Sequence, residues 1–147
     1  MRKIILFALF FLFFGFSFSA RAYAGGFCFN RAGAYYNVPG ALLMAIARVE
    51  SDFNPRAIDY DQNGSYDYGV MQINTVWYPE IRGIWRNLDD PCQNITVGAW
   101  ILKKCFDRYD AVKKAVACYH TGKGRVHSRT AFNYVNKVVY YYKKYEF

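Results

Sequence analysis

Glu50 is a carboxylate on the apolar side of a helical pattern, seven residues after Leu43 and four after Ile46. Charged groups avoid such a face unless they are paired or functional, so this carboxyl is a candidate for chemistry. Partial burial raises the pKa of a carboxyl, and an acid still protonated near neutral pH can protonate a leaving group. Two other interpretations stay open: an ion pair with Arg48 or Arg56, or a helix-end position that faces water.

A second carboxylate, Asp67, follows Glu50 by seventeen residues and precedes Tyr68-Gly69. If the intervening chain folds back as a hairpin, the two carboxylates face each other across a cleft. Two carboxylates around a glycosidic bond are the usual equipment of glycoside hydrolysis, one as acid and the other as nucleophile or base. The alternative is that Asp67 only accepts backbone N–H bonds in the turn.

The loop from Asp59 to Gly64 begins like a calcium-binding EF-hand, with oxygen-bearing side chains at positions one, three and five and glycine at six. Position twelve is Val70 instead of the bidentate Glu that completes such a site, so we expect a turn. There is no CxxC motif, and His120 and His127 are not helical neighbours of two cysteines. We expect neither a metal nor a cofactor.

The elements that must position these acids are mostly helical. Pro39 and Gly40 open a segment with one apolar face that ends near Ser51, and the turn-rich residues 57–68 predict a loop or small hairpin. Three further apolar stripes have helical spacing: Ile95, Ala99, Leu102 and Phe106; Val112, Ala115, Val116 and Tyr119; Phe132, Val135, Val139 and Tyr142. The predicted fold is mainly α, with several helices around a cleft and one small β-hairpin.

The first residues are typical of an export signal. Arg2 and Lys3 precede an apolar run over residues 4–16, and small residues lead to Ala22-Tyr23-Ala24. Cleavage after Ala24 predicts a signal peptide of residues 1–24 and one mature domain of residues 25–147 that does not span a membrane. An uncleaved anchor is the alternative, because residues 4–20 are almost long enough to cross a bilayer.

An even number of cysteines in the exported part predicts two disulfides and an oxidising compartment, periplasmic or extracellular. They are Cys28, Cys92, Cys105 and Cys118. Sequence alone leaves three pairings open. Antiparallel helices around the Tyr109-Asp110 turn would offset Cys105 and Cys118 by only about 4.5 Å along their axes, which favours that pair and leaves Cys28 with Cys92.

The chain is basic. Its formal net charge is +8, and loss of the three cations Arg2, Lys3 and Arg21 with the signal lowers this by three, to +5. From Lys103 onward there are eleven Lys/Arg against three Asp/Glu, which indicates a solvated basic face that would also attract an acidic polymer. Export and the lack of a recognised binding motif argue against nucleic acid as a partner.

Three ordered motifs carry a family resemblance. They are Glu50-Ser51-Asp52-Phe53-Asn54-Pro55, the run NGSYDYGVMQIN over residues 63–74, and Ala117-Cys118-Tyr119-His120-Thr121-Gly122. Together they resemble the soluble lytic transglycosylase (SLT) domain of the lysozyme-like superfamily, over roughly residues 28–125. Cys28 and Asp90-Pro91-Cys92 add a likeness to the small exported transglycosylases that serve type III and type IV secretion, conjugation and pilus systems.

The resemblance implies a reaction and a set of site residues. Glu50 would be the catalytic acid/base that cleaves the β-1,4 bond from N-acetylmuramic acid to N-acetylglucosamine and closes a 1,6-anhydro ring. The side chains that would line the sugar-binding groove are Ser51, Tyr68, Met71, Gln72, Asn74, Tyr119 and His120. The third motif of the family usually ends Tyr-Asn-Ala-Gly, so His120 stands where an Asn is usual.

Two alternatives remain. The spacing from Glu50 to Asp67 and the segment over residues 67–74 also resemble the active-site segment of animal-type lysozymes, which implies a muramidase that hydrolyses the same bond with both carboxylates. A non-catalytic peptidoglycan-binding protein is disfavoured, because a binder needs no acid on an apolar face. We expect a monomeric exported enzyme whose partners are peptidoglycan strands and components of a secretion, conjugation or pilus apparatus.

Overall fold

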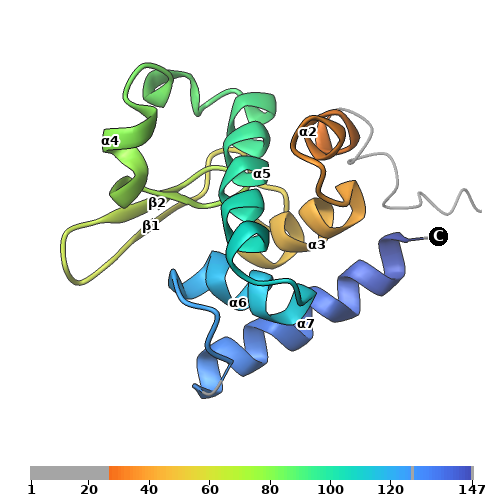
Figure 1. The fold of residues 1–147 in the computed structure, drawn as a ribbon. Coiled ribbons are helices and arrows are strands. Elements are labelled where there is room, and N and C mark those ends of the chain that lie inside the picture. Colours follow the sequence, from red (N-terminus) through yellow and green to blue (C-terminus); the bar gives the residue numbers. More distant parts are fainter. Residues whose placement is uncertain (1–26, 127, 147) are drawn as a thin grey trace, which may run out of the picture.

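The computed structural model describes residues 27–126 and 128–146, so the predicted export signal lies outside the described residues. Helices dominate this part of the chain, as predicted (Figure 1). They are α2 (Phe29–Tyr36), α3 (Gly40–Ser51), α4 (Tyr78–Ile81), α5 (Pro91–Arg108), α6 (Val112–Thr121) and α7 (Arg129–Tyr145). Between α3 and α5 lie β1 (Ile58–Tyr60), β2 (Tyr66–Tyr68), β3 (Ile73–Asn74) and the 3-10 turns η1 (Thr75–Trp77) and η2 (Trp85–Asn87).

Helix α3 has the bounds that its sequence predicts. Pro39 is its N-cap, with φ −61°, and the helix ends where Asp52 adopts the left-handed conformation, with φ 54°. Its buried face consists of fully buried aliphatic side chains: Leu42, Leu43, Ala45, Ile46 and Ala47. Gly40 allows a close approach of α3 to α2, because a Cβ there would lie 3.1 Å from Asn30 Cα and 2.4 Å from Asn30 Oδ1.

The predicted hairpin forms, and it is extended to a three-stranded antiparallel sheet of order β1-β2-β3. Asp67 in the central strand lies opposite Asp59 on one side and Asn74 on the other. Directly opposed residues share one face of a sheet, and the residues next to them in each strand lie on the other face. Ile73 on that other face is fully buried, so Asp67 and Asn74 lie on the face turned away from the core.

Helices α5, α6 and α7 bury apolar stripes, and α5 and α7 begin at side-chain caps. Asp90 caps α5 through bonds from the backbone of Cys92 and Gln93, and Ser128 caps α7. The stripe predicted for α7 is partly wrong, because Phe132 is 54% exposed. The buried face of α7 is shifted by one residue and consists of Ala131, Tyr134, Val135 and Val138.

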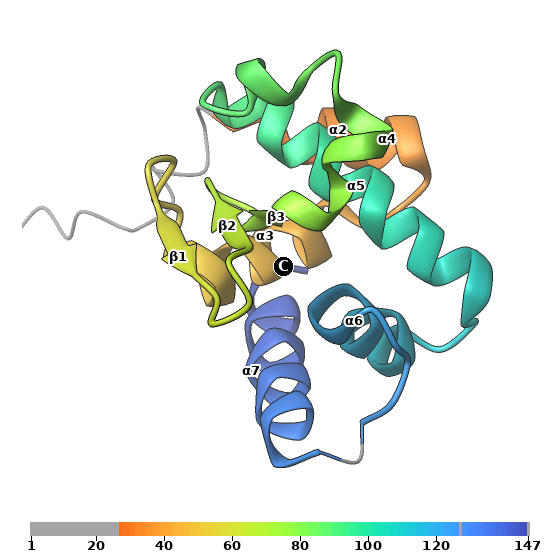
Figure 2. The same ribbon diagram turned by 90° about the vertical axis from the view of Figure 1, so that its left-hand side faces the viewer.

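Figures 1 and 2 show how the elements surround α5. The sheet and α4 lie to one side of α5, and α2 and α3 lie to the other. Helix α7 packs against α3 and α6, while α5 packs against α2 and α6. Among the helices described, none combines the length and apolarity that crossing a membrane requires.

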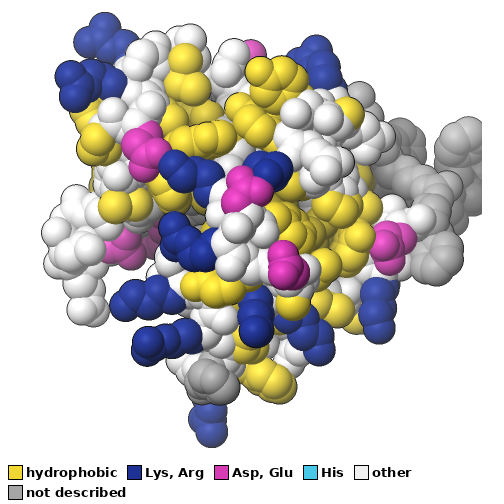
Figure 3. Space-filling view, in the orientation of Figure 1, with side chains coloured by type: hydrophobic (Ala, Val, Ile, Leu, Met, Phe, Trp, Pro, Cys, Tyr) yellow, Lys and Arg dark blue, Asp and Glu magenta, His cyan; other side chains and the backbone are white. Residues whose placement is uncertain are grey.

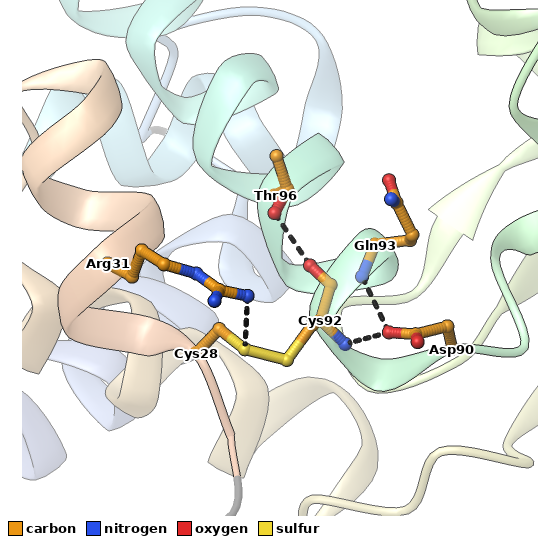
Figure 4. Close-up of a disulfide and its surroundings, with 6 residues drawn as sticks. All are labelled: Cys28, Arg31, Asp90, Cys92, Gln93 and Thr96. Carbon is orange, nitrogen blue, oxygen red and sulfur yellow. Dashed lines mark hydrogen bonds between the residues drawn. A yellow bond between two sulfur atoms is a disulfide. The ribbon is translucent and has the colours of Figure 1, made fainter.

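Both disulfides form in the pairing that the helix geometry favours. Cys105 and Cys118 join α5 to α6 with their Cα atoms 5.7 Å apart, and Cys28 and Cys92 join the start of α2 to the start of α5 with a Cα separation of 5.3 Å. Arg31 donates a hydrogen bond to Cys28 Sγ at 3.1 Å (Figure 4). The bridge between Cys28 and Cys92 spans 64 residues of sequence, so α2, α3, the sheet and α4 all lie within the loop that it closes.

Candidate active site

Glu50 is the next-to-last residue of α3 and is partly buried. The Tyr134 hydroxyl on α7 donates a hydrogen bond to its Oε1 at 2.5 Å. Burial raises the pKa of the carboxyl from 4.5 to about 7, the bond from Tyr134 opposes this rise, and the negative charge of Asp67 adds to it. Arg48, one of the proposed ion-pair partners, pairs with Asp52 instead.

Tyr134 is a site residue that the sequence motifs do not reveal. It is only 7% exposed, and its hydroxyl reaches Glu50 across 84 residues of sequence. Burial and the charge of Glu50 raise its pKa well above 10, so the phenol keeps its proton and remains a donor. The predicted stripe of this helix does not include Tyr134, so its burial, and the need of its buried hydroxyl for a partner, become visible only in the structure.

His120, at the end of α6, stacks on Tyr134 with ring centroids 4.1 Å apart and an interplanar angle of 8°. Burial of the imidazole lowers its pKa below 6.5, so His120 is mainly neutral at pH 7. One face of the ring supports Tyr134, and the residue as a whole remains exposed. His120 therefore packs on the same Tyr134 whose hydroxyl bonds to Glu50.

Tyr119 connects α6 to the segment between β2 and β3. Its hydroxyl donates a hydrogen bond of 2.8 Å to the Met71 carbonyl. Burial, together with the charges of Glu50 and Asp67, raises its pKa well above 10, so it also stays neutral. The bond fixes the strand segment relative to the helix that carries His120.

Ser51 and Gln72 hold the same segment from the other side. Ser51 Oγ donates to the Val70 carbonyl at 2.7 Å, which ties the end of α3 to the approach to β3. Gln72 has φ 48°, and its Nε2 donates to the Gly69 carbonyl at 2.8 Å. These side chains fix the backbone beside Glu50.

Asn94 is the fully buried polar residue of the described chain, and the motifs did not single it out. Its Oδ1 accepts from the Met71 amide at 2.7 Å, and its Nδ2 donates to the carbonyls of Tyr68 at 2.9 Å and Leu88 at 3.3 Å. Gly69 adopts φ +80°, and a Cβ there would lie 2.3 Å from Asn94 Nδ2. Only glycine therefore permits this contact.

The predicted groove residues differ in what they offer to a ligand. Tyr68, Gln72 and Asn74 are partly buried, while Met71 is fully buried, with its side chain packed at Gly98. Asn74 also caps η1, because its side chain accepts from the Val76 amide at 2.8 Å. The side chain of Met71 thus lies in the core. Its backbone amide and carbonyl bond to Asn94 and Tyr119, and these two bonds hold the segment beside the site.

Asp67 is near enough to Glu50 for its charge to raise the pKa of that carboxyl. Its own pKa is raised, chiefly by burial and then by the charges of Asp61 and Asp59, while Asn74 opposes the shift. The arrangement is asymmetric: Glu50 is the group that holds a proton near neutral pH, and Asp67 supplies negative charge beside it.

The residues expected to form a turn do so. Asp61 Oδ2 accepts hydrogen bonds from Ser65 Oγ and Asn74 Nδ2, and Asn63 Oδ1 accepts from the Ser65 amide. Within residues 27–126 and 128–146, no group of three His, Cys, Asp or Glu side chains is arranged to hold a metal ion. What this site can do is proton transfer, through Glu50.

The described residues form a small helical fold of the lysozyme-like type, with a short sheet beside a carboxyl whose pKa is raised to about 7. Comparison with known proteins makes this specific: the chain belongs to the transglycosylase SLT domain family, whose model matches residues 27–138. An inactive mutant of the lytic transglycosylase Slt from Pseudomonas aeruginosa has a similar fold, with a TM-score of 0.68 and 22% identity over 88% of this chain and 24% of that one.

Relatives of known sequence match most of the chain. Protein IpgF of Shigella flexneri is 32% identical over 80% of this chain and 78% of its own length. Invasion protein IagB of Salmonella typhimurium (strain LT2) is 35% identical over 80% of this chain and 76% of its own. A peptidoglycan-binding-like protein of Escherichia coli O157:H7 is 32% identical over 84% and 80%, respectively.

Proposed function

We propose that the protein is a peptidoglycan lytic transglycosylase with Glu50 as its catalytic acid and base. The observation that carries this proposal is a carboxyl with a pKa of about 7, bonded to the buried hydroxyl of Tyr134, in a chain of the SLT family. General acid catalysis is most efficient when the pKa of the acid lies near the working pH.

In the proposed reaction Glu50 acts twice. Its carboxyl donates a proton to the oxygen between N-acetylmuramic acid and N-acetylglucosamine, and the bond from that oxygen to the muramyl C1 breaks. The carboxylate then takes the proton of the muramyl 6-hydroxyl, whose oxygen bonds to C1 and closes a 1,6-anhydro ring. Glu50 ends with its proton restored, and no water is consumed.

Tyr134 would act between these two steps. A hydroxyl donates a stronger hydrogen bond to an ionised carboxylate than to a neutral acid. Tyr134 therefore stabilises the form of Glu50 that exists after proton donation and holds it in one orientation until the 6-hydroxyl reacts. His120 stacks on the Tyr134 ring and so supports this position.

The groove residues divide into two proposed roles. Tyr68, Gln72, Asn74 and His120 are proposed to contact sugar rings with the surface that they leave accessible, and Gln72 also holds the backbone through its bond to Gly69. The remaining members of the set act by holding the backbone through the bonds described above: Ser51, Met71 and Tyr119.

Hydrolysis is the second candidate, because the charge of Asp67 acts on Glu50. In that reaction Asp67 would stabilise the positive charge that develops on the sugar ring, or attack it, and water would complete the cleavage. A transglycosylase requires only one acid/base. For Asp67 we therefore propose an assisting electrostatic role.

Mass spectrometry of muropeptides released from purified peptidoglycan tests the proposal. We expect products that end in 1,6-anhydro-N-acetylmuramic acid. Reducing ends would establish the hydrolase instead. Intact strands after prolonged incubation with the folded, disulfide-bonded protein would refute both reactions and leave a binding protein.

We propose further that the protein is exported and cuts the wall locally for an envelope-spanning machine. Two disulfides support an oxidising compartment, and the similarity to IagB, an invasion protein, supports the machine. Mature protein beginning at Gly25 should appear in the periplasm or medium. A strain that carries only the Glu50→Gln form should assemble the machine as poorly as a deletion strain.

A further inference from the structure

We propose that the outer edge of strand β1 binds an extended segment of a partner protein, in which apolar and basic side chains alternate, as an added β-strand. Strand β1 (Ile58–Tyr60) is an edge of the three-stranded sheet, because β2 is its one neighbour in the strand order. All three of its residues are exposed, so the described residues leave this edge uncovered. A free edge presents backbone groups with which another chain can pair.

The outward backbone groups of this edge belong to Ile58 and Tyr60. The Gly69 amide of the neighbouring segment donates to the Ala57 carbonyl at 2.8 Å. Ala57, and with it Asp59 two residues on, therefore directs its backbone polar groups at β2. In an antiparallel pair such residues alternate with residues whose N–H and C=O groups point away from the partner strand. The groups of Ile58 and Tyr60 thus form the row to which a further strand would bond.

One face of this edge is apolar and aromatic. Ile58 is 49% exposed and Tyr60 is 76% exposed, and both side chains lie on the same face because they are two residues apart. The Tyr60 ring lies 5.9 Å from the Tyr66 ring. Trp85 in turn lies 6.2 Å from Tyr66 and 5.5 Å from Tyr78, so the aromatic surface continues from the edge to α4. Figure 3 shows hydrophobic side chains beside Lys and Arg around α4, at the upper left. Exposed aromatic side chains in one group are typical of a surface that binds another protein.

The other face of the edge is acidic. Asp59 lies between Ile58 and Tyr60 and shares its face with Asp67, which is opposite it in β2. Neither carboxylate takes part in an ion pair of the described residues. A Lys or Arg of an added strand, placed beside Asp59, would offset this charge, whereas β1 of a second copy would bring another Asp59. The charges therefore favour a foreign strand with basic side chains on this face.

A synthetic heptapeptide of alternating Val and Lys tests the assignment against one of alternating Val and Glu. The reporter is the ¹⁵N NMR spectrum of the mature, disulfide-bonded protein. We expect the Val/Lys peptide to shift the amides of Ile58 and Tyr60 most and to bind at least about tenfold more tightly than the Val/Glu peptide. Asp59→Lys should reverse this preference. Asp110→Lys makes the same charge change at an exposed carboxylate after α5 and should leave the preference unaltered.

A pair of variants at Ile58 separates the backbone from the side chain. Ile58→Ala removes the apolar side chain and keeps the outward amide, while Ile58→Pro removes both, and an edge strand tolerates proline where its N–H faces outward. We expect the proline variant to bind the Val/Lys peptide at least about threefold more weakly than the alanine variant, with similar melting. Equal binding by the two folded variants would overturn strand addition.

The remaining outcomes also decide the assignment. It would be overturned by shifts that map elsewhere, by a preference that Asp59→Lys leaves unchanged, or by equal binding of a peptide with the same composition in scrambled order. Shifts of Tyr60 and Trp85 by a tetramer of N-acetylglucosamine, with none from the Val/Lys peptide, would make the surface a sugar site instead. A dimer of the free protein paired through β1 would make a second copy the occupant. None of these measurements requires cleavage, so a protein that leaves glycan strands uncut would refute the proposed function and not this edge.

Discussion

At the scale of single residues, Glu50 and Tyr134 each change the proton affinity of the other. The hydroxyl lowers the pKa of Glu50 against a larger effect of burial, and the carboxylate raises the pKa of Tyr134. Near neutral pH the pair therefore holds two protons or one, and the proton that leaves first belongs to Glu50. An acid that must also serve as a base requires both states within reach.

Glu50→Gln should abolish cleavage and leave the fold intact, because the amide is nearly isosteric but cannot donate a proton at neutral pH. A rate loss of at least about a hundredfold is expected in the release of muropeptides. Asp107→Asn makes the same change at an exposed carboxylate of α5 and should retain activity. Substantial turnover by folded Glu50→Gln would remove Glu50 from the mechanism.

The same substitution should stabilise the protein above neutral pH. The folded pKa of about 7 exceeds the unfolded value of 4.5, so native Glu50 destabilises the fold progressively as pH rises from about 4.5 to 7. Gln lacks this penalty, which amounts to as much as about 3 kcal/mol at pH 8. Urea unfolding at pH 8 and pH 4 checks the sign, since the gain should be larger at pH 8.

Tyr134→Phe should lower the rate and shift its pH profile. Activity is expected to fall as pH rises through about 7, because Glu50 then loses the proton that it donates. Without the hydroxyl, the pKa of Glu50 should rise, so the variant should lose its remaining activity at higher pH than the wild type. Tyr35→Phe, at a 78% exposed ring, is the control. An unshifted profile would separate Tyr134 from the titration of Glu50.

Asp67→Asn removes a charge and keeps the shape. We expect a rate loss clearly smaller than that of Glu50→Gln, unchanged melting, and an alkaline limb that moves to lower pH, because the charge of Asp67 raises the pKa of Glu50. The pH–rate profile of the purified variant measures the rate loss and the position of the alkaline limb, and a melting curve measures the stability. A loss as deep as that of Glu50→Gln, with reducing-end products, would instead make the protein a hydrolase.

At the scale of elements, the sequence pattern predicted the helices and turns that are determined by interactions between residues close in sequence. Helix α3 follows from its caps and aliphatic stripe, and the hairpin follows from a turn-rich loop between strand formers. Strand β3 has only two residues and exists because β2 lies beside it, so no periodicity could reveal it. In α7 aromatic residues occur on several faces, and tertiary contact selected Tyr134 over Phe132 for burial.

Asn94 joins three elements, so its loss should loosen more than α5. Asn94→Leu keeps the size but leaves the Met71 amide and the carbonyls of Tyr68 and Leu88 without their partner. We expect destabilisation of about 2 to 4 kcal/mol in chemical unfolding, with faster hydrogen exchange in residues 68–74. Gln93→Leu, at the exposed neighbour, should change stability by less than about 0.5 kcal/mol.

At the scale of the whole molecule, ordered motifs predicted the family and Glu50, whereas contacts between distant segments stayed hidden. Glu50 and Tyr134 meet only because α7 packs on α3, and Asn94 reaches Met71 only because α5 crosses the sheet segment. The sequence separation of such pairs follows no regular period, so no pattern in the sequence could predict them. The cysteine pairing was an intermediate case, since an antiparallel helix pair has a geometry that sequence separation can approximate.

The two disulfides should differ in stabilising effect. The bridge from Cys28 spans 64 residues and that from Cys105 spans 13, so loop entropy predicts losses of about 4 and 3 kcal/mol when each pair is replaced by serine. Equilibrium unfolding of the two double variants measures this order. The unreduced wild type, unfolded in urea, should show no reactive thiol, and two or more would contradict the presence of two disulfides.

The origin of Tyr134 in the last helix has a consequence for timing. If the chain is exported unfolded, as proposed, it emerges from its N-terminus, so Glu50 and the motif around residues 67–74 would reach the wall before α7 does. Until residues 129–145 have crossed and packed on α3, the acid lacks both its hydroxyl partner and the enclosure that α7 gives it. If Tyr134 has the role proposed for it, cutting would wait for completed translocation, and a half-exported chain would not attack the wall it is entering.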